Sequence, residues 1–303
     1  MEIREIAGPA TRLYLGTSIA LGLKAARSLP RACSDRVSAF CPQMKPSPLF
    51  DAHFHVIDDR FPLVPNHGFL SERFTVDQYL NRLSGYNLRG GAIVSGSFQA
   101  FDQSYLIDAL TRLGPSFVGV TQLPSDVTDS EILRLDRLGI RGLRFNLRRG
   151  GSENITHLVR MADRVHKLAG WHIELYVDSA DLSELHGTLL KLPALCIDHL
   201  GLSSRGKPAL LRLVERGVMV KASGFGRVDF PVAAILQELF NINPQALMFG
   251  TDLPSTRAPH PYSDDDFQLV VNTLGEAAAE QVLHRNAVKF YKIESKPRSE
   301  NIL

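Results

Sequence analysis

Two histidines separated by one residue, His53 and His55, come at the end of an apolar stretch and could act together on one small molecule. Side chains at positions i and i+2 of a β-strand project to the same face, so both imidazoles would converge while Phe54 turns the other way. Such a pair can bind a metal ion or exchange protons and hydrogen bonds with a substrate. Histidine pairs also occur as structural hydrogen bonders, so the pair by itself does not define a site.

Two more residues that can do chemistry, His199 and Asp252, each lie at the end of an apolar stretch further along the chain. Three imidazoles and one carboxylate brought together could serve as acid, base and hydrogen-bond donors. The same four groups could bind zinc, which takes nitrogen and carboxylate oxygen ligands in proteins. We therefore predict His53, His55, His199 and Asp252 as the catalytic group or, if a metal is present, as its ligands.

Three further polar residues are candidates for substrate contacts. Arg144 alternates with apolar residues in the stretch 142–146, which predicts that it points into the interior of the fold. A buried guanidinium needs an anionic partner, and this partner could be an internal carboxylate or a carboxylate or phosphate of the substrate. Tyr176 could fill core space or hydrogen-bond a ligand, and Ser97 is an additional hydrogen-bonding candidate.

The segments that must position these residues alternate between strand-like and helix-like patterns. Strands are expected to end near His55, Ser97, Gln122, Asn146, Val177, His199, Ser223 and Thr251. Amphipathic helices are expected over residues 75–84, 103–113, 129–138, 155–168, 180–190, 208–215, 232–240 and 267–282. Eight such pairs predict an α/β protein, a single-domain (β/α)8 TIM barrel, whose sites lie at the C-terminal ends of the strands. A doubly wound open sheet is less favoured, because no glycine-rich phosphate loop follows the first strand.

The bulk properties fit a globular domain and disfavour two classes of partner. Of the 303 residues, 44% are hydrophobic and 22% are charged, and the net charge of +2 disfavours nucleic acid as the main partner. The longest weakly polar run, 13–23, is too short to cross a bilayer. Three cysteines make no disulfide framework, which favours a cytoplasmic location. We expect residues 1–43 to be a mobile extension and residues 44–303 to form the barrel domain.

Four segments together resemble the amidohydrolase superfamily, specifically its amidohydrolase-related branch. They contain the predicted site residues and lie within residues 49–293: Phe50-Asp51-Ala52-His53-Phe54-His55, Gly142-Leu143-Arg144-Phe145-Asn146, Ile197-Asp198-His199-Leu200-Gly201 and Phe249-Gly250-Thr251-Asp252-Leu253-Pro254. The resemblance implies a distorted (β/α)8 barrel with the histidine pair, His199 and Asp252 at its centre.

One departure from the family pattern concerns the metal. Many members carry a metal-binding histidine on the fifth strand, where this chain has Tyr176. In this respect the chain is similar to the metal-independent lactonases typified by 2-pyrone-4,6-dicarboxylate lactonase. The resemblance implies that Arg144 and Arg227 hold substrate carboxylates, with Arg148 and Arg149 as possible further contacts.

These features predict a hydrolase that opens a carboxylated lactone, either a compound like 2-pyrone-4,6-dicarboxylate or a sugar lactone. Asp252 would take a proton from water, and His199, with His53 or His55, would donate hydrogen bonds to the carbonyl oxygen. No cofactor would be required. The first alternative is a metal-dependent hydrolase or decarboxylase of the same family, with zinc or manganese bound by the same four residues. The second is a non-catalytic barrel that binds an organic acid.

Overall fold

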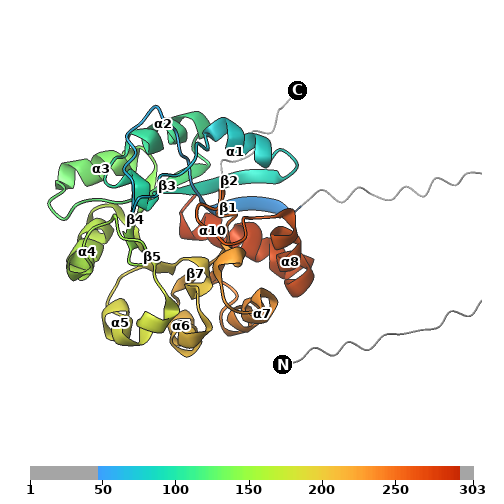
Figure 1. The fold of residues 1–303 in the computed structure, drawn as a ribbon. Coiled ribbons are helices and arrows are strands. Elements are labelled where there is room, and N and C mark those ends of the chain that lie inside the picture. Colours follow the sequence, from blue (N-terminus) through green and yellow to red (C-terminus); the bar gives the residue numbers. More distant parts are fainter. Residues whose placement is uncertain (1–46, 294–303) are drawn as a thin grey trace, which may run out of the picture. The chain divides into compact units, whose positions relative to one another are not determined.

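The computed structural model describes residues 47–293, which form eight parallel strands surrounded by helices (Figure 1). The strands follow one another around the sheet in chain order. They are β1 Pro48–Phe54, β2 Asn87–Val94, β3 Phe117–Thr121, β4 Ile140–Asn146, β5 His172–Tyr176, β6 Leu195–Ile197, β7 Met219–Ala222 and β8 Leu247–Phe249. This architecture confirms the predicted (β/α)8 barrel.

The predicted mobile extension 1–43, with Cys33 and Cys41, lies outside the described residues. The third cysteine, Cys196, is a free thiol buried inside the barrel. Within residues 47–293, no helix combines the length and the apolar character needed to cross a membrane.

The first seven helices lie on the outside of the barrel between successive strands, as their amphipathic patterns predict, and the last three follow β8. They are α1 Val76–Arg82, α2 Ser104–Leu113, α3 Asp129–Arg137, α4 Leu158–Ala169, α5 Leu182–Leu189, α6 Lys207–Glu215, α7 Val232–Ile242, α8 Asp264–Leu274, α9 Glu276–Glu280 and α10 Asn286–Phe290. The prediction of one continuous helix over residues 267–282 is wrong. Gly275 has a φ of 77°, which ends α8 and starts α9, because helical backbone requires a negative φ.

Several strands end earlier than predicted, and this displaces the site residues onto the loops. β2 ends at Val94 instead of Ser97, and β6 ends at Ile197 instead of His199. At both places the chain leaves the ladder and forms a short 3-10 turn, over Ser97–Gln99 and His199–Gly201. The side chains at the barrel mouth are therefore held by turns just beyond the strands.

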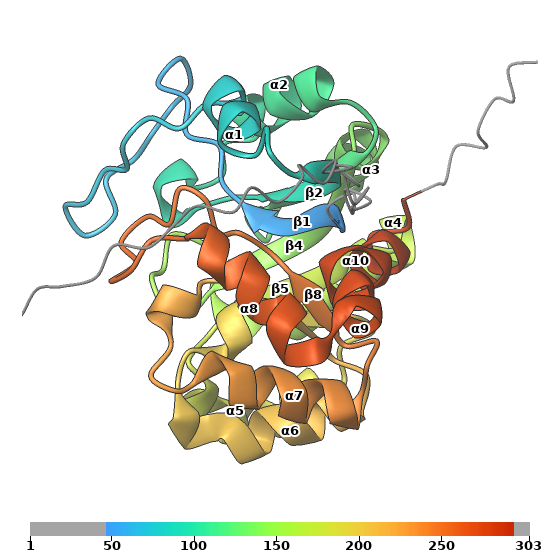
Figure 2. The ribbon, with the colours of Figure 1, turned by 90° about the vertical axis from the view of Figure 1, so that its right-hand side faces the viewer.

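An apolar plug fills the lower half of the barrel, at the N-terminal ends of the strands. Its inward-facing residues come from several strands and are covered by the helix α10 and Tyr291. In Figure 2, the loops after β1 and β8 extend from one end of the barrel, whereas α10 lies at the other. A closed lower end leaves the mouth, at the C-terminal ends of the strands, as the place for a site.

The barrel closes between β8 and β1 through loop hydrogen bonds, since no ladder joins these two strands among the described residues. The amide of Asp252 donates to the carbonyl of His53 at 2.7 Å, and Asp51 accepts from both the amide and the hydroxyl of Thr251 at 2.8 and 2.7 Å. Gly250 permits this approach, because a Cβ there would lie 2.6 Å from the amide nitrogen of His53. The closure places the end of β8 directly against the histidine pair.

Candidate active site

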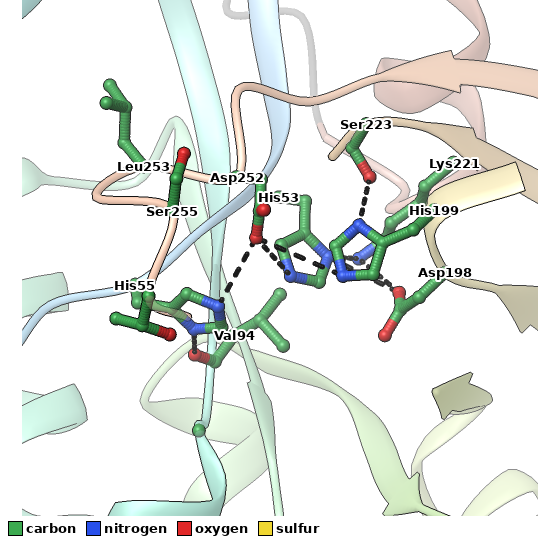
Figure 3. A network of polar contacts seen from close by, with 12 residues as sticks. His53, His55, Val94, Asp198, His199, Lys221, Ser223, Asp252, Leu253 and Ser255 are labelled. Carbon is green, nitrogen blue, oxygen red and sulfur yellow. Dashed lines mark hydrogen bonds and ion pairs between the residues drawn. The ribbon is translucent and has the colours of Figure 1, made fainter. Parts of the chain in front are cut away.

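A bulge in β1 presents the histidine pair to the barrel mouth. The pairing of β1 with β2 shifts register between Asp51 and Phe54, which changes the phase of the strand. As predicted, Phe54 turns outward, where its ring stacks on Tyr79 at 3.8 Å between centroids. The rings of His53 and His55 lie inside, with their centroids 5.1 Å apart (Figure 3).

Asp252 lies at the centre of the site and brings the four predicted catalytic residues together (Figure 3). Its Oδ1 atom lies 3.9 Å from Nε2 of His53, 3.7 Å from Nε2 of His55 and 3.9 Å from Nε2 of His199. Its Oδ2 atom accepts a 2.6 Å hydrogen bond from Nε of Arg227. The convergence that the sequence predicts is therefore present, and Arg227 is in contact with it.

Two left-handed residues make this convergence possible. Strand alternation after β6 would direct Asp198 inward and His199 outward. His199 has a φ of 50° instead, and the turn brings both side chains to the interior, where they are almost completely buried. Asp252 also has a positive φ, of 60°. Non-glycine residues in this region cost roughly 1–3 kcal/mol each and are found mainly at functional sites.

The electrostatics favour an ionised carboxylate among neutral imidazoles. Burial alone would raise the pKa of Asp252, but the Arg227 guanidinium and His199 lower it well below its usual range. Burial lowers the pKa of His199 to about 4, against the opposing charge of Asp252. Burial and the positive charge of Lys221 lower the pKa of His53 well below its ordinary value. At neutral pH, Asp252 is thus charged, whereas His53 and His199 are not.

Backbone and hydroxyl groups orient two of the imidazoles. Nδ1 of His55 lies 2.7 Å from the carbonyl oxygen of Val94, which can only accept, so this nitrogen carries the proton. The other ring nitrogen of His55, Nε2, lies 3.7 Å from Oδ1 of Asp252. Nδ1 of His199 lies 3.0 Å from the hydroxyl of Ser223, which can donate to it and leave the proton on Nε2.

A layer of buried charges lies between this group and the apolar plug. Arg144, only 2% exposed, donates to Asp198 at 2.8 Å and to the carbonyl of Ser95 at 2.8 Å. Lys221 and Glu174, both fully buried, form an ion pair beside them. The sequence patterns gave no role to Glu174, Lys221 or Asp198. The pattern that could have identified them is a charged residue at an inward-facing position of an otherwise apolar strand.

A narrow cavity of about 30 Å³ opens above the histidines, which is room for one or two water molecules. The residues that line it include six of the predicted site residues: His55, Ser97, Arg144, Tyr176, His199 and Arg227. His53 and Asp252 are completely buried beneath them. The cavity adjoins a second hollow of about 310 Å³, and both are lined by Arg149, Tyr176, Arg227 and Arg257.

Arg257 is a site residue that the sequence analysis missed. It lies on the loop after β8 and donates to Oγ of Ser97 at 3.0 Å and to the amide oxygen of Asn66 at 3.1 Å. Among residues 47–293, neither Arg257 nor Arg149 has a carboxylate within 4.0 Å. Burial and the nearby charges of Arg149 and Arg227 lower the pKa of Arg257. The mouth therefore has an excess of positive charge, which suits an anionic ligand.

The donor atoms also fit a divalent metal. His53, His55 and Asp252 each offer one ligand atom in one group, and His53, Asp198 and His199 form another. Nε2 of His53 and Oδ1 of Asp252 are buried without hydrogen-bond partners in the described part of the chain, and a cation could satisfy both. Zinc accepts this mixture of nitrogen and oxygen ligands.

Comparison with known proteins assigns the barrel to a family. A model of the family described as Amidohydrolase matches residues 50–293, and the chain therefore belongs to this family. A 2-pyrone-4,6-dicarboxylate hydrolase of Comamonas testosteroni is 29% identical over 166 residues, which cover 53% of this chain and 54% of the relative. The chain thus aligns with about half the length of that relative.

Two further likenesses extend over more of the chain. A 4-sulfomuconolactone hydrolase of Hydrogenophaga intermedia is 25% identical over 68% of this chain and 74% of the relative. The crystal structure of a probable 2-pyrone-4,6-dicarboxylic acid hydrolase from Acinetobacter baumannii shares the fold, with a TM-score of 0.70 and 21% identity over 80% of this chain and 99% of that one. Both curated relatives are named as hydrolases, one of a pyrone dicarboxylate and one of a sulfomuconolactone.

Proposed function

We propose that this protein hydrolyses a lactone that carries one or more carboxylates, and that it does so without a metal. The observation that carries the proposal is the position of Asp252, whose Oδ1 atom faces three imidazoles beneath a cavity lined by arginines. Hydrogen-bonding and anion-binding groups thereby line one small space, and the base lies directly beneath it. The names of two relatives, each a lactone hydrolase, support the same reaction.

The reaction would begin with a water molecule in the narrow cavity. Asp252 removes a proton from this water, and the resulting hydroxide attacks the lactone carbonyl carbon. Nε2–H of His199, together with a second imidazole, stabilises the negative charge on the carbonyl oxygen. The tetrahedral intermediate then collapses with cleavage of the ring C–O bond, and protonated Asp252 returns the proton to the departing oxygen. His55 is poorly suited to donate here, because its proton is held at Nδ1 by Val94.

Arginines would place the substrate for this attack. Arg227 adjoins Asp252, so a carboxylate bound to it lies next to the general base. Tyr176 and Ser97 lie on the cavity wall and can hydrogen-bond the ring or its substituents. Arg144 also reaches the cavity, although its own ion pair with Asp198 already uses part of its donor capacity.

Replacement of Arg257 by glutamine tests the anionic character of the substrate. We expect KM for a dicarboxylated lactone to rise about 10- to 100-fold, because one charge-assisted hydrogen bond contributes about 1.5–3 kcal/mol. The value of kcat should change little, since Arg257 would hold a carboxylate of the substrate and takes no part in the proton transfer. Steady-state kinetics would measure both, with Arg160→Gln on the exposed face of α4 as the matched control. An unchanged KM would remove Arg257 from the substrate site.

The pH dependence follows from the charge states of the site. Asp252 has a pKa well below its usual range, and His199 has a pKa of about 4, so both keep their active forms down to mildly acidic pH. We expect kcat/KM to stay constant from about pH 8 to about pH 5 and to fall only as the pH approaches 4. Initial rates in overlapping buffers would show this. A fall centred near 6.5, the ordinary histidine value, would contradict it.

The first alternative is a metal-dependent hydrolase or decarboxylase. A zinc or manganese ion would be held by His53, His55, His199 and Asp252 and would polarise the substrate and lower the pKa of water. The deciding experiment tests hydrolysis of a panel of carboxylated and sugar lactones with and without a chelator. The release of protons on ring opening measures the rate. Turnover that survives chelation supports the proposal. Turnover that is lost on chelation and restored by zinc or manganese favours the alternative, and no turnover at all leads to tests of decarboxylation.

We also propose a cytoplasmic location, on the basis of the unpaired and buried thiol of Cys196. Fractionation of cells with an antibody against the protein would test it.

A further inference from the structure

Lys221, on β7, is a fully buried lysine directly behind the catalytic group, and the proposed reaction gives it no role. Lysines are almost never fully buried unless they are paired. Its ammonium is paired with Glu174, lies 3.8 Å from Oδ1 of Asp198 and lies 3.3 Å from Nδ1 of His53 (Figure 3). It is thus placed to act on the site through His53.

Three charged groups lie near Nδ1 of His53: Lys221, Asp198 and, more distant at 3.8 Å, Oε1 of Glu174. An ammonium has only protons to offer, so contact with Lys221 favours a lone pair on this nitrogen. Oδ1 of Asp198 also lies 3.3 Å away and would favour a proton there. This oxygen is nevertheless without any hydrogen-bond partner in residues 47–293, whereas the contact with Lys221 has hydrogen-bonding geometry. The geometry at Nδ1 therefore favours Lys221.

The other edge of the ring leads to the same result. Nε2 of His53 faces Oδ1 of Asp252 at 3.9 Å, and a carboxylate favours a proton on the nitrogen that faces it. The contacts at Nδ1 and at Nε2 therefore both favour a neutral His53 whose single proton is on Nε2.

We infer that Lys221 is a positioning residue that holds His53 in the tautomer with the proton on Nε2. His53 then donates a hydrogen bond toward the mouth, and under the proposed function it is the second imidazole that stabilises the oxyanion. The same proton withholds the Nε2 lone pair from a metal ion. Lys221 thereby biases a set of residues that could bind zinc toward hydrogen-bond donation.

Removal of Lys221 should reverse this preference. Without the ammonium, Asp198 is free to accept a proton from Nδ1, and the lone pair of Nε2 turns to the mouth. It would then join Nε2 of His55 and Oδ1 of Asp252, two atoms already within 3.7 Å of each other. A change next to a ligating histidine typically alters metal affinity 10- to 100-fold. We expect a gain of about this size.

The test uses the double variant Lys221→Met/Glu174→Gln, which removes the ammonium without leaving a buried carboxylate unpaired. Glu174→Gln alone is the matched control, because it retains Lys221. Nitrogen-15 NMR of labelled histidines should show an unprotonated Nδ1 and a protonated Nε2 for His53 in the wild type and the control. The double variant should show the opposite pattern. A protonated Nδ1 in the wild type would overturn the inference.

Titration calorimetry with zinc chloride provides a second readout that needs no substrate. The double variant should bind one zinc ion about 10- to 100-fold more tightly than the wild type and the control. Equal affinity in all three proteins would contradict the inference, even if the proposed lactone hydrolysis proved correct. Conversely, a tautomer switch in a protein that hydrolyses no lactone would support the role of Lys221 and refute the proposed function alone.

Discussion

Replacement of Asp252 by asparagine is expected to reduce kcat on a carboxylated lactone by about 1,000-fold, with KM changed by less than about threefold. Proton transfer by a positioned general base contributes about 100- to 10,000-fold to a rate, and asparagine has no basic oxygen to provide it. The amide keeps nearly the same volume, so the three surrounding imidazoles should remain in place. Single-turnover rates with saturating lactone would measure the loss of the chemical step directly.

The control for this variant is Asp265→Asn, at an exposed position in the first turn of α8. It makes the same chemical change far from the mouth and should leave kcat within about twofold of the wild type. If Asp252→Asn kept more than about a tenth of the wild-type kcat, Asp252 would not be the general base. His55, which lines the cavity and lies 3.7 Å from Asp252, would then be the next candidate.

Replacement of Arg144 by methionine is expected to lower the free energy of unfolding by about 3–5 kcal/mol. Arg144 is the hydrogen-bonded partner of the fully buried Asp198, and loss of one member of a buried ion pair leaves the other charge uncompensated. Urea denaturation followed by circular dichroism would measure this change. The result would show whether the internal salt bridge or the substrate is the main partner of this arginine.

Two comparisons sharpen the test. Arg137→Met, at the exposed end of α3, should change the unfolding free energy by less than about 0.5 kcal/mol. The double variant Arg144→Met/Asp198→Asn should recover much of the lost stability, because it removes both charges. If Arg144→Met were as stable as the wild type but bound substrate weakly, its role would be confined to substrate binding.

The sequence patterns were sufficient for the barrel and for the identity of the groups at its mouth. Repeated alternation of strands and helices has few solutions, and the (β/α)8 barrel places the C-terminal ends of all strands at one mouth. His53 and His55 lie at the end of β1, whereas His199 and Asp252 follow the ends of β6 and β8, and the structure brings the four side chains together.

Strand alternation predicted the directions of His53, Phe54 and His55, but not those of His199 and Asp252. The left-handed backbone at His199 and at Asp252 decides where these two side chains point. Such features depend on contacts between neighbouring strands, so a single strand pattern does not reveal them. Arg257 was missed for a similar reason: it lies on an irregular loop and reaches Ser97 only through the closure of β8 on β1.

The sequence by itself thus determined the fold and the four chemical groups that meet at its mouth. Only the tertiary structure decided the partners of these groups: Arg144 with Asp198, Arg227 with Asp252, and Lys221 with Glu174 and His53. The physical reason is the range of the interactions. Residue type and periodicity are local properties of the chain, whereas buried charges pair through space with residues far apart in the sequence.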